Sequence, residues 1–198
     1  MLTTFTLCVI AYLFGSFSSA VIVCHLMGLP DPRTQGSGNP GATNVLRHGG
    51  KKAAIITLFF DVLKGIVAVL LARFFVPDDT LTLAGVTLAV FLGHLYPIFF
   101  QFKGGKGVAT AFGGLLALVW QVGIAALITW LAMAFAFRYS SLSAIITAIC
   151  VPVFTYFFSN DLYYTTSSIV ISVLLIWRHR SNIKKLLNGE EDKIGEKA

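Results

Sequence analysis

Charged side chains are scarce in this chain of 198 residues, of which 12% are Asp, Glu, Lys or Arg and 56% are hydrophobic. A soluble domain carries roughly 25% charged residues, because polar groups must cover its surface. The shortage excludes an ordinary soluble protein and predicts an all-α integral membrane protein, one polytopic domain over residues 1–198. The first basic residue is Arg33, so the N-terminal apolar run lacks the basic start of a removable signal peptide and is expected to be a permanent helix.

Cysteine is also rare, and the motifs of several common enzyme classes are missing. Cys8, Cys24 and Cys150 lie inside apolar runs and form no CxxC pair, so they predict buried free thiols rather than a disulfide or a zinc site. The sequence has no GxSxG nucleophile elbow, no histidine followed five residues later by Asp, and no evident catalytic carboxylate pair. His, Cys and carboxylate residues do not cluster with metal-ligand spacing. No metal and no cofactor is therefore expected.

Long apolar runs set the predicted helices, because about 20 apolar residues are needed to cross a bilayer. One further run, Gly107–Phe137, has no charged residue and leaves two alternatives open, one long tilted helix or two short ones. Trp120, Gln121 and Gly123 mark a weak interruption at its middle. The other predicted spans are Leu2–Met27, Ala53–Val76, Leu81–Phe100, Ser141–Phe158 and Leu162–Trp177.

The distribution of basic residues decides between the two alternatives. If Gly107–Phe137 crosses twice, every Lys and Arg except Lys64 and Arg73 falls on one side of the membrane, and the connectors on the other side are acidic. Basic residues favour the cytoplasmic side, so the pattern predicts seven transmembrane helices, N-terminus outside and C-terminus inside. The fourth and fifth helices would be short for full spans. The net charge of +6 then indicates topology, and no nucleic-acid partner is expected.

Polar segments at 28–52, 101–107 and 178–198 would then lie on the cytoplasmic side. The first contains GSGNPGATNVLR at 36–47, whose glycines and proline are expected to prevent a regular helix and to aim backbone N–H groups at an anion. Arg47 adds a guanidinium suited to phosphate. The GxGxxG pattern here lacks a surrounding βαβ unit, so no dinucleotide site is expected, and a structural turn between helices stays an alternative. The neutral hydrogen-bonding residues are Ser37, Asn39, Thr43 and Asn44.

The second segment carries FKGGKGVAT at 102–110. It is similar to a P-loop, but it lacks the first glycine of that pattern and has Gly107 where Ser or Thr would hold magnesium, so nucleotide hydrolysis is not expected. A glycine-rich loop that opens a membrane helix predicts a phosphate site, with Lys103 and Lys106 neutralising the charge. An ordinary basic loop that follows membrane topology is the alternative, but it explains the lysines and not the glycines.

The third segment, RHRSNIKKLLNGEE at 178–191, continues the last membrane helix. His179 and Asn182 are three residues apart and share a helix face, with Arg178 and Lys185 near the same side. This arrangement allows a polar site, and a topology anchor or an anionic-lipid contact is the alternative. The last dozen residues are rich in Glu and Lys and are expected to form a mobile tail.

Two charges fall inside the second predicted span. Asp61 and Lys64 are three residues apart, and charges inside a membrane are costly unless they pair or line the protein interior. We expect a structural ion pair, with part of a polar site as the alternative. His94, near the end of the third span, is expected to support the following loop rather than to bind a metal.

The three segments, in this order and spacing, resemble the acyl-phosphate-dependent glycerol-3-phosphate acyltransferases of bacteria, the family known as PlsY. The resemblance covers nearly the full chain and rests on GSGNPGATNVLR at 36–47, GHLYPIFFQFKGGKGVAT at 93–110 and RHRSNIKKLLNGEE at 178–191. It implies a multi-pass protein of the bacterial plasma (inner) membrane whose active site faces the cytoplasm. It also implies transfer of a fatty acyl group from acyl phosphate to the 1-hydroxyl of sn-glycerol 3-phosphate, giving lysophosphatidic acid and phosphate in phospholipid synthesis.

The resemblance further implies which residues act. Ser37, Arg47, Lys106 and His179 would form the catalytic group, a substrate phosphate would accept the hydroxyl proton, and Lys185 stands where the family commonly has Arg. No cofactor is implied; membrane lipids surround the chain, and an acyl-phosphate-producing enzyme is the expected functional partner. The implied substrate-binding residues are Gly38, Asn39, Thr43, Asn44, Lys103, Gly104, Gly105, Gly107, Val108 and Asn182.

Two other function classes stay open. A transporter of phosphorylated metabolites or lipids would also use a basic anion site, but such a site is expected near the bilayer midplane, between broken helices. The glycine-rich segments of this chain are instead predicted at helix ends. A non-catalytic scaffold that binds anionic lipids is the third class, and it requires no specific glycine pattern.

Overall fold

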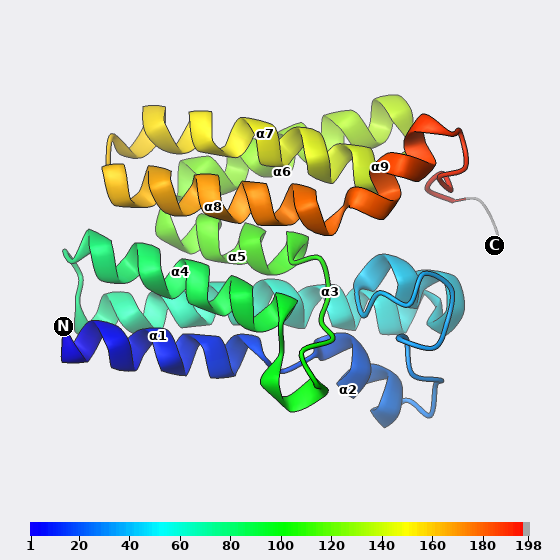
Figure 1. Ribbon diagram of the computed structural model, residues 1–198, viewed down its shortest axis with the longest axis horizontal. Coiled ribbons are helices and arrows are strands. Elements are labelled where there is room, and N and C mark those ends of the chain that lie inside the picture. Colours follow the sequence, from blue (N-terminus) through cyan, green and yellow to red (C-terminus); the bar gives the residue numbers. More distant parts are fainter. Residues whose placement is uncertain (196–198) are drawn as a thin grey trace.

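The computed structural model describes residues 1–195, which form a bundle of helices lying roughly side by side (Figure 1). Successive long helices alternate in direction, so the connectors at 27–41, 96–107 and 138–139 and the C-terminal residues 178–195 meet at one end of the bundle, and the connectors at 76–79, 119 and 160–161 lie at the other (Figure 1). Within the described range there is no strand. The elements are α1 Leu2–Gly15, α2 Ser19–Leu26, α3 Ala42–Phe75, α4 Thr80–Leu95, the 3-10 turn η1 Ile98–Phe100, α5 Val108–Leu118, α6 Trp120–Phe137, α7 Ser140–Ser159, α8 Leu162–Arg178 and α9 Arg180–Leu187.

The bundle exposes large apolar side chains and buries small hydroxyl ones. Phe135 and Phe74 are 92% and 81% exposed, whereas Thr57 and Thr82 are fully buried. Such a surface would be unfavourable in water, but it suits contact with hydrocarbon. Interfaces rich in small and hydroxyl residues are typical of packed membrane helices. The distribution of exposed apolar and buried hydroxyl side chains therefore agrees with the prediction, made from the composition, of an integral membrane protein.

The apolar helices of the bundle include some that are long enough to cross a bilayer and some that are shorter. Val108–Leu118 and Leu162–Arg178 are apolar but short. The predicted all-helical character is confirmed, while the count of seven crossings and the direction of the termini stay predictions. Residues 196–198, the end of the third predicted segment, lie outside the described residues. Five segments are long and apolar enough to cross a bilayer: Leu2–Leu26, Ala42–Phe75, Thr80–Phe100, Trp120–Phe137 and Ser140–Ser159.

A single extended residue separates α5 from α6. Val119 has φ −143° and ψ 97°, and the chain reverses its direction there (Figure 1). Arg73 of α3 donates a hydrogen bond to the carbonyl oxygen of Leu118 over 2.7 Å, which satisfies one of the carbonyl groups left free at the end of α5. Of the two alternatives for Gly107–Phe137, two short helices are therefore correct, and the interruption lies one residue before Trp120.

The first predicted helix is wrong in one respect, because Leu2–Met27 is broken between Gly15 and Ser19 into α1 and α2. The break leaves the carbonyl oxygen of Phe17 outside both helices, where it accepts a hydrogen bond from Lys64 Nζ over 3.1 Å. The hydropathy of residues 2–27 does not predict this break, because the polar group that binds the Phe17 carbonyl oxygen comes from another helix.

The sequence predicts that residues 36–47 do not form a regular helix. This prediction is wrong in part, because α3 begins at Ala42. The turns end at Gly41, and nothing in the sequence from Ala42 to Arg47 opposes a helix. A kink follows at Gly50, whose φ of 85° lies in the region that only glycine adopts readily. The first part of α3 is therefore set at an angle to its long membrane part.

Glycine residues allow α3 and α5 to touch along their backbones. A Cβ atom built on Gly113 would collide with the carbonyl group of Val62, and one on Gly65 would collide with the backbone of α5. Close backbone approach through small residues is a common way of packing membrane helices. Because both contacts are with backbone rather than with flexible side chains, neither helix can move aside cheaply.

We predict that Gly113→Ala destabilises the protein, by about 1–3 kcal/mol if overpacking here resembles that in other cores. The matched control is Gly114→Ala one residue later, where the added Cβ would meet only the Thr87 methyl group at 3.1 Å. The measurement is the Tm of each purified variant in detergent. Equal Tm values for the two variants would contradict this account of the α3–α5 contact.

Candidate active site

The three polar segments predicted from the sequence meet at the end of the bundle that carries α2, η1 and α9 (Figure 1). Direct bonds join the second segment to the third. Arg178 binds the glycine loop, and Lys106 binds Asn182. The first segment joins them through an ion pair between Arg47 and Asp192. Residues far apart in the sequence thus form one polar surface.

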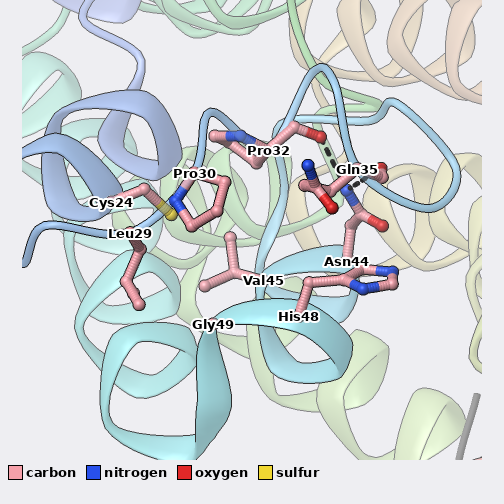
Figure 2. Close-up of a pocket in the computed structure, with 9 residues that line it drawn as sticks. All are labelled: Cys24, Leu29, Pro30, Pro32, Gln35, Asn44, Val45, His48 and Gly49. Atoms are coloured by element: carbon pink, nitrogen blue, oxygen red, sulfur yellow. Dashed lines mark hydrogen bonds between the residues drawn. The ribbon is translucent and has the colours of Figure 1, made fainter.

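The first segment is held in shape by Asn44, which is buried at the start of α3. Its Nδ2 donates to the carbonyl oxygens of Pro32 (2.8 Å) and Gln35 (3.0 Å), and its Oδ1 accepts from the Ser37 N–H (3.2 Å). Figure 2 shows this amide reaching from α3 toward Pro32 and Gln35. Both amide hydrogens are used inside the loop, so Asn44 acts on a ligand through the loop.

The second segment begins where α4 ends. The sequence predicts a helix to Phe100, but α4 ends at Leu95 and a 3-10 turn follows over Ile98–Phe100. Pro97 explains the difference, since proline disfavours a helical conformation in the residue before it. Gln101 and Phe102 then adopt positive φ values of 56° and 58°, which turns the chain back toward α4.

The glycine loop rests directly on His94. The Gly105 N–H donates to the His94 carbonyl oxygen over 3.2 Å. A Cβ atom on Gly104 would collide with that carbonyl, and one on Gly105 would collide with the imidazole ring. Gly107, with φ 85°, then opens α5, whose first N–H groups have no partner within the helix. The glycines are therefore required by close contact, and the loop presents backbone donors.

Arg178 fixes the same loop from the end of α8. Its Nη2 donates to the Gly104 carbonyl oxygen over 2.7 Å and its Nε to the Gly105 carbonyl oxygen over 3.2 Å. The guanidinium also lies 5.7 Å from the centre of the Tyr96 ring, in the range of a cation–π contact. Arg178 therefore binds the protein's own backbone, with its fork turned to carbonyl groups.

Lys106 is the cation at the centre of the site. Its Nζ donates to Asn182 Oδ1 over 2.6 Å, and Asn182 Nδ2 donates to Glu191 Oε1 over 2.7 Å. Burial lowers the pKa of the Lys106 ammonium to about 8, an effect that Glu191 opposes and that nearby cations, including Arg47, reinforce. The group is charged at neutral pH and held in one position by Asn182.

His179 is buried where α8 gives way to α9. Its Nδ1 lies 2.8 Å from the Leu175 carbonyl oxygen, and since a carbonyl only accepts, Nδ1 carries the hydrogen. Burial lowers the pKa of the imidazole to about 4. The ring is therefore neutral at physiological pH, and its Nε2 is a hydrogen-bond acceptor.

Residues Glu190–Gly195, which we call the C-terminal strap, return from α9 across the site. Asp192 Oδ2 lies 2.9 Å from Arg47 Nη1. Further on, the Ile194 N–H donates to the Arg138 carbonyl oxygen (2.6 Å), and Arg138 Nη2 donates to the Ile194 carbonyl oxygen (2.9 Å). The residues up to Ile194, for which the sequence predicts a mobile tail, are therefore bound to two distant segments, through Arg47 and Arg138.

The predicted pair of charges lies beneath the glycine loop. Lys64 Nζ is 2.8 Å from Asp61 Oδ1, and His94 Nδ1 is 3.4 Å from the same oxygen. Thr110 Oγ1 also lies 3.2 Å from His94 Nδ1. The pair is buried inside the protein, as expected, and it fixes the histidine on which the loop rests.

An apolar groove of about 420 Å³ runs between α1–α2 and the long part of α3. Phe17, Ile22, Phe60 and Val67 are among its lining residues, and Lys64 lies at its wall. Its lining is almost entirely apolar. The groove therefore offers a hydrocarbon-like surface that leads to the ion pair below the glycine loop.

Comparison with known proteins now identifies the family. A family model described as glycerol-3-phosphate acyltransferase matches residues 5–189. The chain belongs to the glycerol-3-phosphate acyltransferase family. A relative of that name from Cupriavidus metallidurans is 58% identical over 192 residues, which cover 96% of this chain and 95% of the relative. Another from Thioalkalivibrio sulfidiphilus is 54% identical over 187 residues, covering 94% and 92%.

Two solved structures share the fold. Both are crystal structures of PlsY, an integral membrane glycerol 3-phosphate acyltransferase. Its glycerol 3-phosphate form is 41% identical to this chain, with a TM-score of 0.92 and coverage of 97% of this chain and 96% of the other. Its lysophosphatidic acid form is 40% identical, with a TM-score of 0.90 and coverage of 97% and 95%. The predicted family is thus confirmed, and the chain is an all-helical integral membrane protein of a bacterial family.

Within this family fold, the residues named from the resemblance fall into two groups. Lys106, His179 and Asn182 lie together with the loop of Gly104, Gly105, Gly107 and Val108, and Arg47 reaches them through the strap. Asn44 is buried and binds the loop of its own segment. The remaining five are exposed or partly exposed, with Thr43 in the first turn of α3 and the other four on turns or loops, and among the described contacts none joins their side chains to Lys106. These are Ser37, Gly38, Asn39, Thr43 and Lys103.

Three contributions to the site are missing from the sequence prediction. The sequence predicts only that Arg178 lies near the polar side of the last helix, whereas it binds carbonyl oxygens of the glycine loop. Glu191 and Asp192 were placed in the tail, but they face Asn182 and Arg47. Gly189, with φ 72°, is the one signal for the second case, since a glycine after a helix predicts a sharp change of direction. No sequence signal shows whether an arginine such as Arg178 binds backbone carbonyl groups or an anionic ligand.

The described residues, 1–195, contain no group of three His, Cys, Asp or Glu side chains close enough to hold a metal ion. Cys8, Cys24 and Cys150 are free thiols, of which Cys24 is buried and the other two are partly buried. The polar groups of the site are therefore amide, imidazole, ammonium, guanidinium and carboxylate groups. The basic ones give it a strong preference for anions.

We predict that the affinity for glycerol 3-phosphate falls as the pH rises through about 8, because the Lys106 ammonium, whose pKa burial lowers to about 8, loses its charge there. The loss between pH 7 and pH 9 should be about tenfold. Lys106→Arg keeps its charge over this range and should lack the alkaline loss. Calorimetric titration of both proteins tests this, and the same alkaline loss in both would contradict it.

Proposed function

We propose that the chain transfers a fatty acyl group from acyl phosphate to the 1-hydroxyl of sn-glycerol 3-phosphate, releasing lysophosphatidic acid and phosphate. Membership of the glycerol-3-phosphate acyltransferase family supports this activity. The observation that carries it is the glycine loop with Lys106 at its centre, held by Asn182 and Arg178. Backbone donors and a fixed ammonium group form a site for phosphate at a helix start.

The reaction needs charge stabilisation more than acid or base catalysis. The 1-hydroxyl oxygen attacks the acyl carbonyl carbon, the bond from that carbon to the phosphate oxygen breaks, and the departing phosphate takes the hydroxyl proton. Two anionic substrates must come together, and the acyl oxygen gains negative charge. Lys106, Arg47 and the loop N–H groups supply positive potential at fixed positions, which lowers both barriers.

The remaining catalytic residues orient the acceptor. The Nδ1–H bond to Leu175 aims the neutral His179 ring, so that its Nε2 can accept a hydrogen bond from a substrate hydroxyl. Ser37 lies on the turn that Asn44 organises and adds a further hydroxyl for the substrate. Gly38, Asn39 and Lys103 lie on turns and loops at the rim of the site, and Thr43 lies in the first turn of α3. There they would contact the phosphate groups.

The acyl chain requires an apolar surface, and the groove between α1–α2 and α3 supplies one. A chain lying there would leave its phosphate at the motif end of the bundle. This placement explains why a reaction between small anions takes place in a membrane protein. Acyl phosphate is a reactive mixed anhydride, so an acyl-phosphate-producing enzyme is the expected functional partner, and membrane lipids surround the rest of this single domain.

For topology we propose seven crossings in the bacterial inner membrane, with the N-terminus outside and the active site facing the cytoplasm. The alternating directions of α1, α3, α4, α5, α6, α7 and α8 support an odd number of crossings (Figure 1). Basic residues outside the long helices lie at the motif end, which favours the cytoplasmic side. α5, although only 11 residues long, packs against α3, α4 and α6 and needs little contact with lipid.

One assay tests activity and orientation together. Palmitoyl phosphate and radiolabelled glycerol 3-phosphate are added, without coenzyme A or acyl carrier protein, to inverted and to right-side-out membrane vesicles that contain the protein. We expect labelled lysophosphatidate from inverted vesicles, and from right-side-out vesicles only after detergent is added. The Lys106→Ala variant is the control, because it lacks the cation at the centre of the site.

Each alternative gives a different result. A transporter would accumulate labelled glycerol 3-phosphate without forming lipid, and an anionic-lipid scaffold would do neither. No labelled lysophosphatidate after detergent would overturn the enzymatic proposal. Immediate synthesis in right-side-out vesicles would overturn the orientation alone.

A further inference from the structure

Arg178 is a cation beside a phosphate site, yet its guanidinium faces the protein. It donates to the carbonyl oxygens of Gly104 and Gly105, and it lies against Tyr96. Its Nε and Nη2 atoms are therefore used by the loop, while the Tyr96 ring lies against the guanidinium. Two of the three donor nitrogens of Arg178 are thus directed to the protein's own backbone rather than to a ligand.

The two bonds determine where the loop donors point. In a trans peptide the C=O and N–H groups point in opposite directions. Because the Gly104 carbonyl faces Arg178, the Gly105 N–H faces the other way, where it meets the His94 carbonyl oxygen. Because the Gly105 carbonyl also faces Arg178, the Lys106 N–H points away from Arg178. Arg178 on one side and His94 on the other thus fix two successive peptide planes.

We infer that Arg178 is a positioning residue for the reaction, which turns the Gly104–Lys106 peptides so that the Lys106 N–H and ammonium face the substrate phosphate. The inference rests on the proposed function, since it assigns a role in that site. A residue that positions the loop differs in one measurable respect from a residue that contributes only its positive charge. A role through two carbonyl bonds requires the planar fork of arginine, which lysine cannot reproduce.

The test compares Arg178→Lys and Arg178→Gln with Arg180→Lys, an exposed arginine two residues later that lies on Trp177. We expect both Arg178 variants to raise KM for the two phosphate substrates about tenfold, since each loses at least one charge-assisted hydrogen bond, with a smaller change in kcat. Arg180→Lys should leave both constants unchanged. Tm in detergent should stay close to that of the unsubstituted protein in all three.

Two outcomes would overturn the inference. One is an Arg178→Lys variant with an unchanged KM beside an Arg178→Gln variant with a raised KM, which would make the charge alone responsible. The other is a fall in Tm that accounts for the loss of activity in both variants. An inactive unsubstituted protein would instead count against the proposed function, so the two failures can be told apart.

A second inference comes from the C-terminal strap, independently of the loop. Asp192 presents a carboxylate to Arg47, and the strap is anchored beyond it by the two bonds between Ile194 and Arg138. Carboxylate and phosphate groups bind a guanidinium through the same kind of paired oxygens. A substrate phosphate that binds Nη1 of Arg47 must therefore displace the carboxylate of Asp192.

The ion pair has the exposure expected of a contact that can be displaced. The side chain of Asp192 is 54% exposed and that of Arg47 is 24% exposed, and such pairs are weak in water. The anchor at Arg138 keeps the carboxylate close when it is displaced, so it can return once the ligand leaves. We infer that Asp192 is an internal competitor for the phosphate position at Arg47.

The test is Asp192→Asn beside Glu190→Gln, which removes the same charge from an exposed carboxylate two residues earlier. We expect Asp192→Asn to lower KM for glycerol 3-phosphate about threefold, in keeping with a weak ion pair, and Glu190→Gln to leave it unchanged. An equal decrease in both variants would indicate a general charge effect and overturn the inference. A raised KM in Asp192→Asn would also overturn it, because Asp192 would then orient Arg47 for the substrate.

Discussion

An ion pair inside the bundle connects the membrane helices to the glycine loop. Asp61 and Lys64 are buried, where isolated charges are costly and must be satisfied by further partners. Lys64 binds the carbonyl oxygen of Phe17, which is available only because the helix is broken there. Asp61 lies beside His94, on which Gly105 rests. The break in one helix, the charges of a second and the end of a third thus fix one loop.

Arginine has two distinct uses in the site, and the difference lies in what each guanidinium meets. The guanidinium of Arg178 meets two carbonyl groups and therefore shapes the backbone. The guanidinium of Arg47 meets a partly exposed carboxylate and is available to exchange it for another anion. Lys106 lies between these extremes, held by Asn182 but still charged. The site contains few charged side chains, and each of these three is held in place by a neighbouring polar group.

Hydropathy and charge predict the helices and the grouping of the three segments, since both are properties of long stretches. The break at Phe17, the α3 start at Ala42 and the α4 end at Leu95 depend on single contacts or single residues, and only Pro97 marked one of them. The family motifs predict which residues matter. They do not predict that Asn44 binds its own loop or that Asp192 reaches Arg47, because both contacts depend on how distant segments fold together.

The shortness of α5 has a consequence for the depth of the chemistry. Eleven residues span about 16 Å, roughly half the hydrocarbon thickness of about 30 Å. The far end of α5 is held by Arg73, close to the end of α3. In the proposed seven-crossing topology, the glycine loop at the other end of α5 would lie below the level of the lipid headgroups. An acyl phosphate bound as proposed would then react without its chain leaving the leaflet, and the water-soluble acceptor would enter the site from the headgroup side.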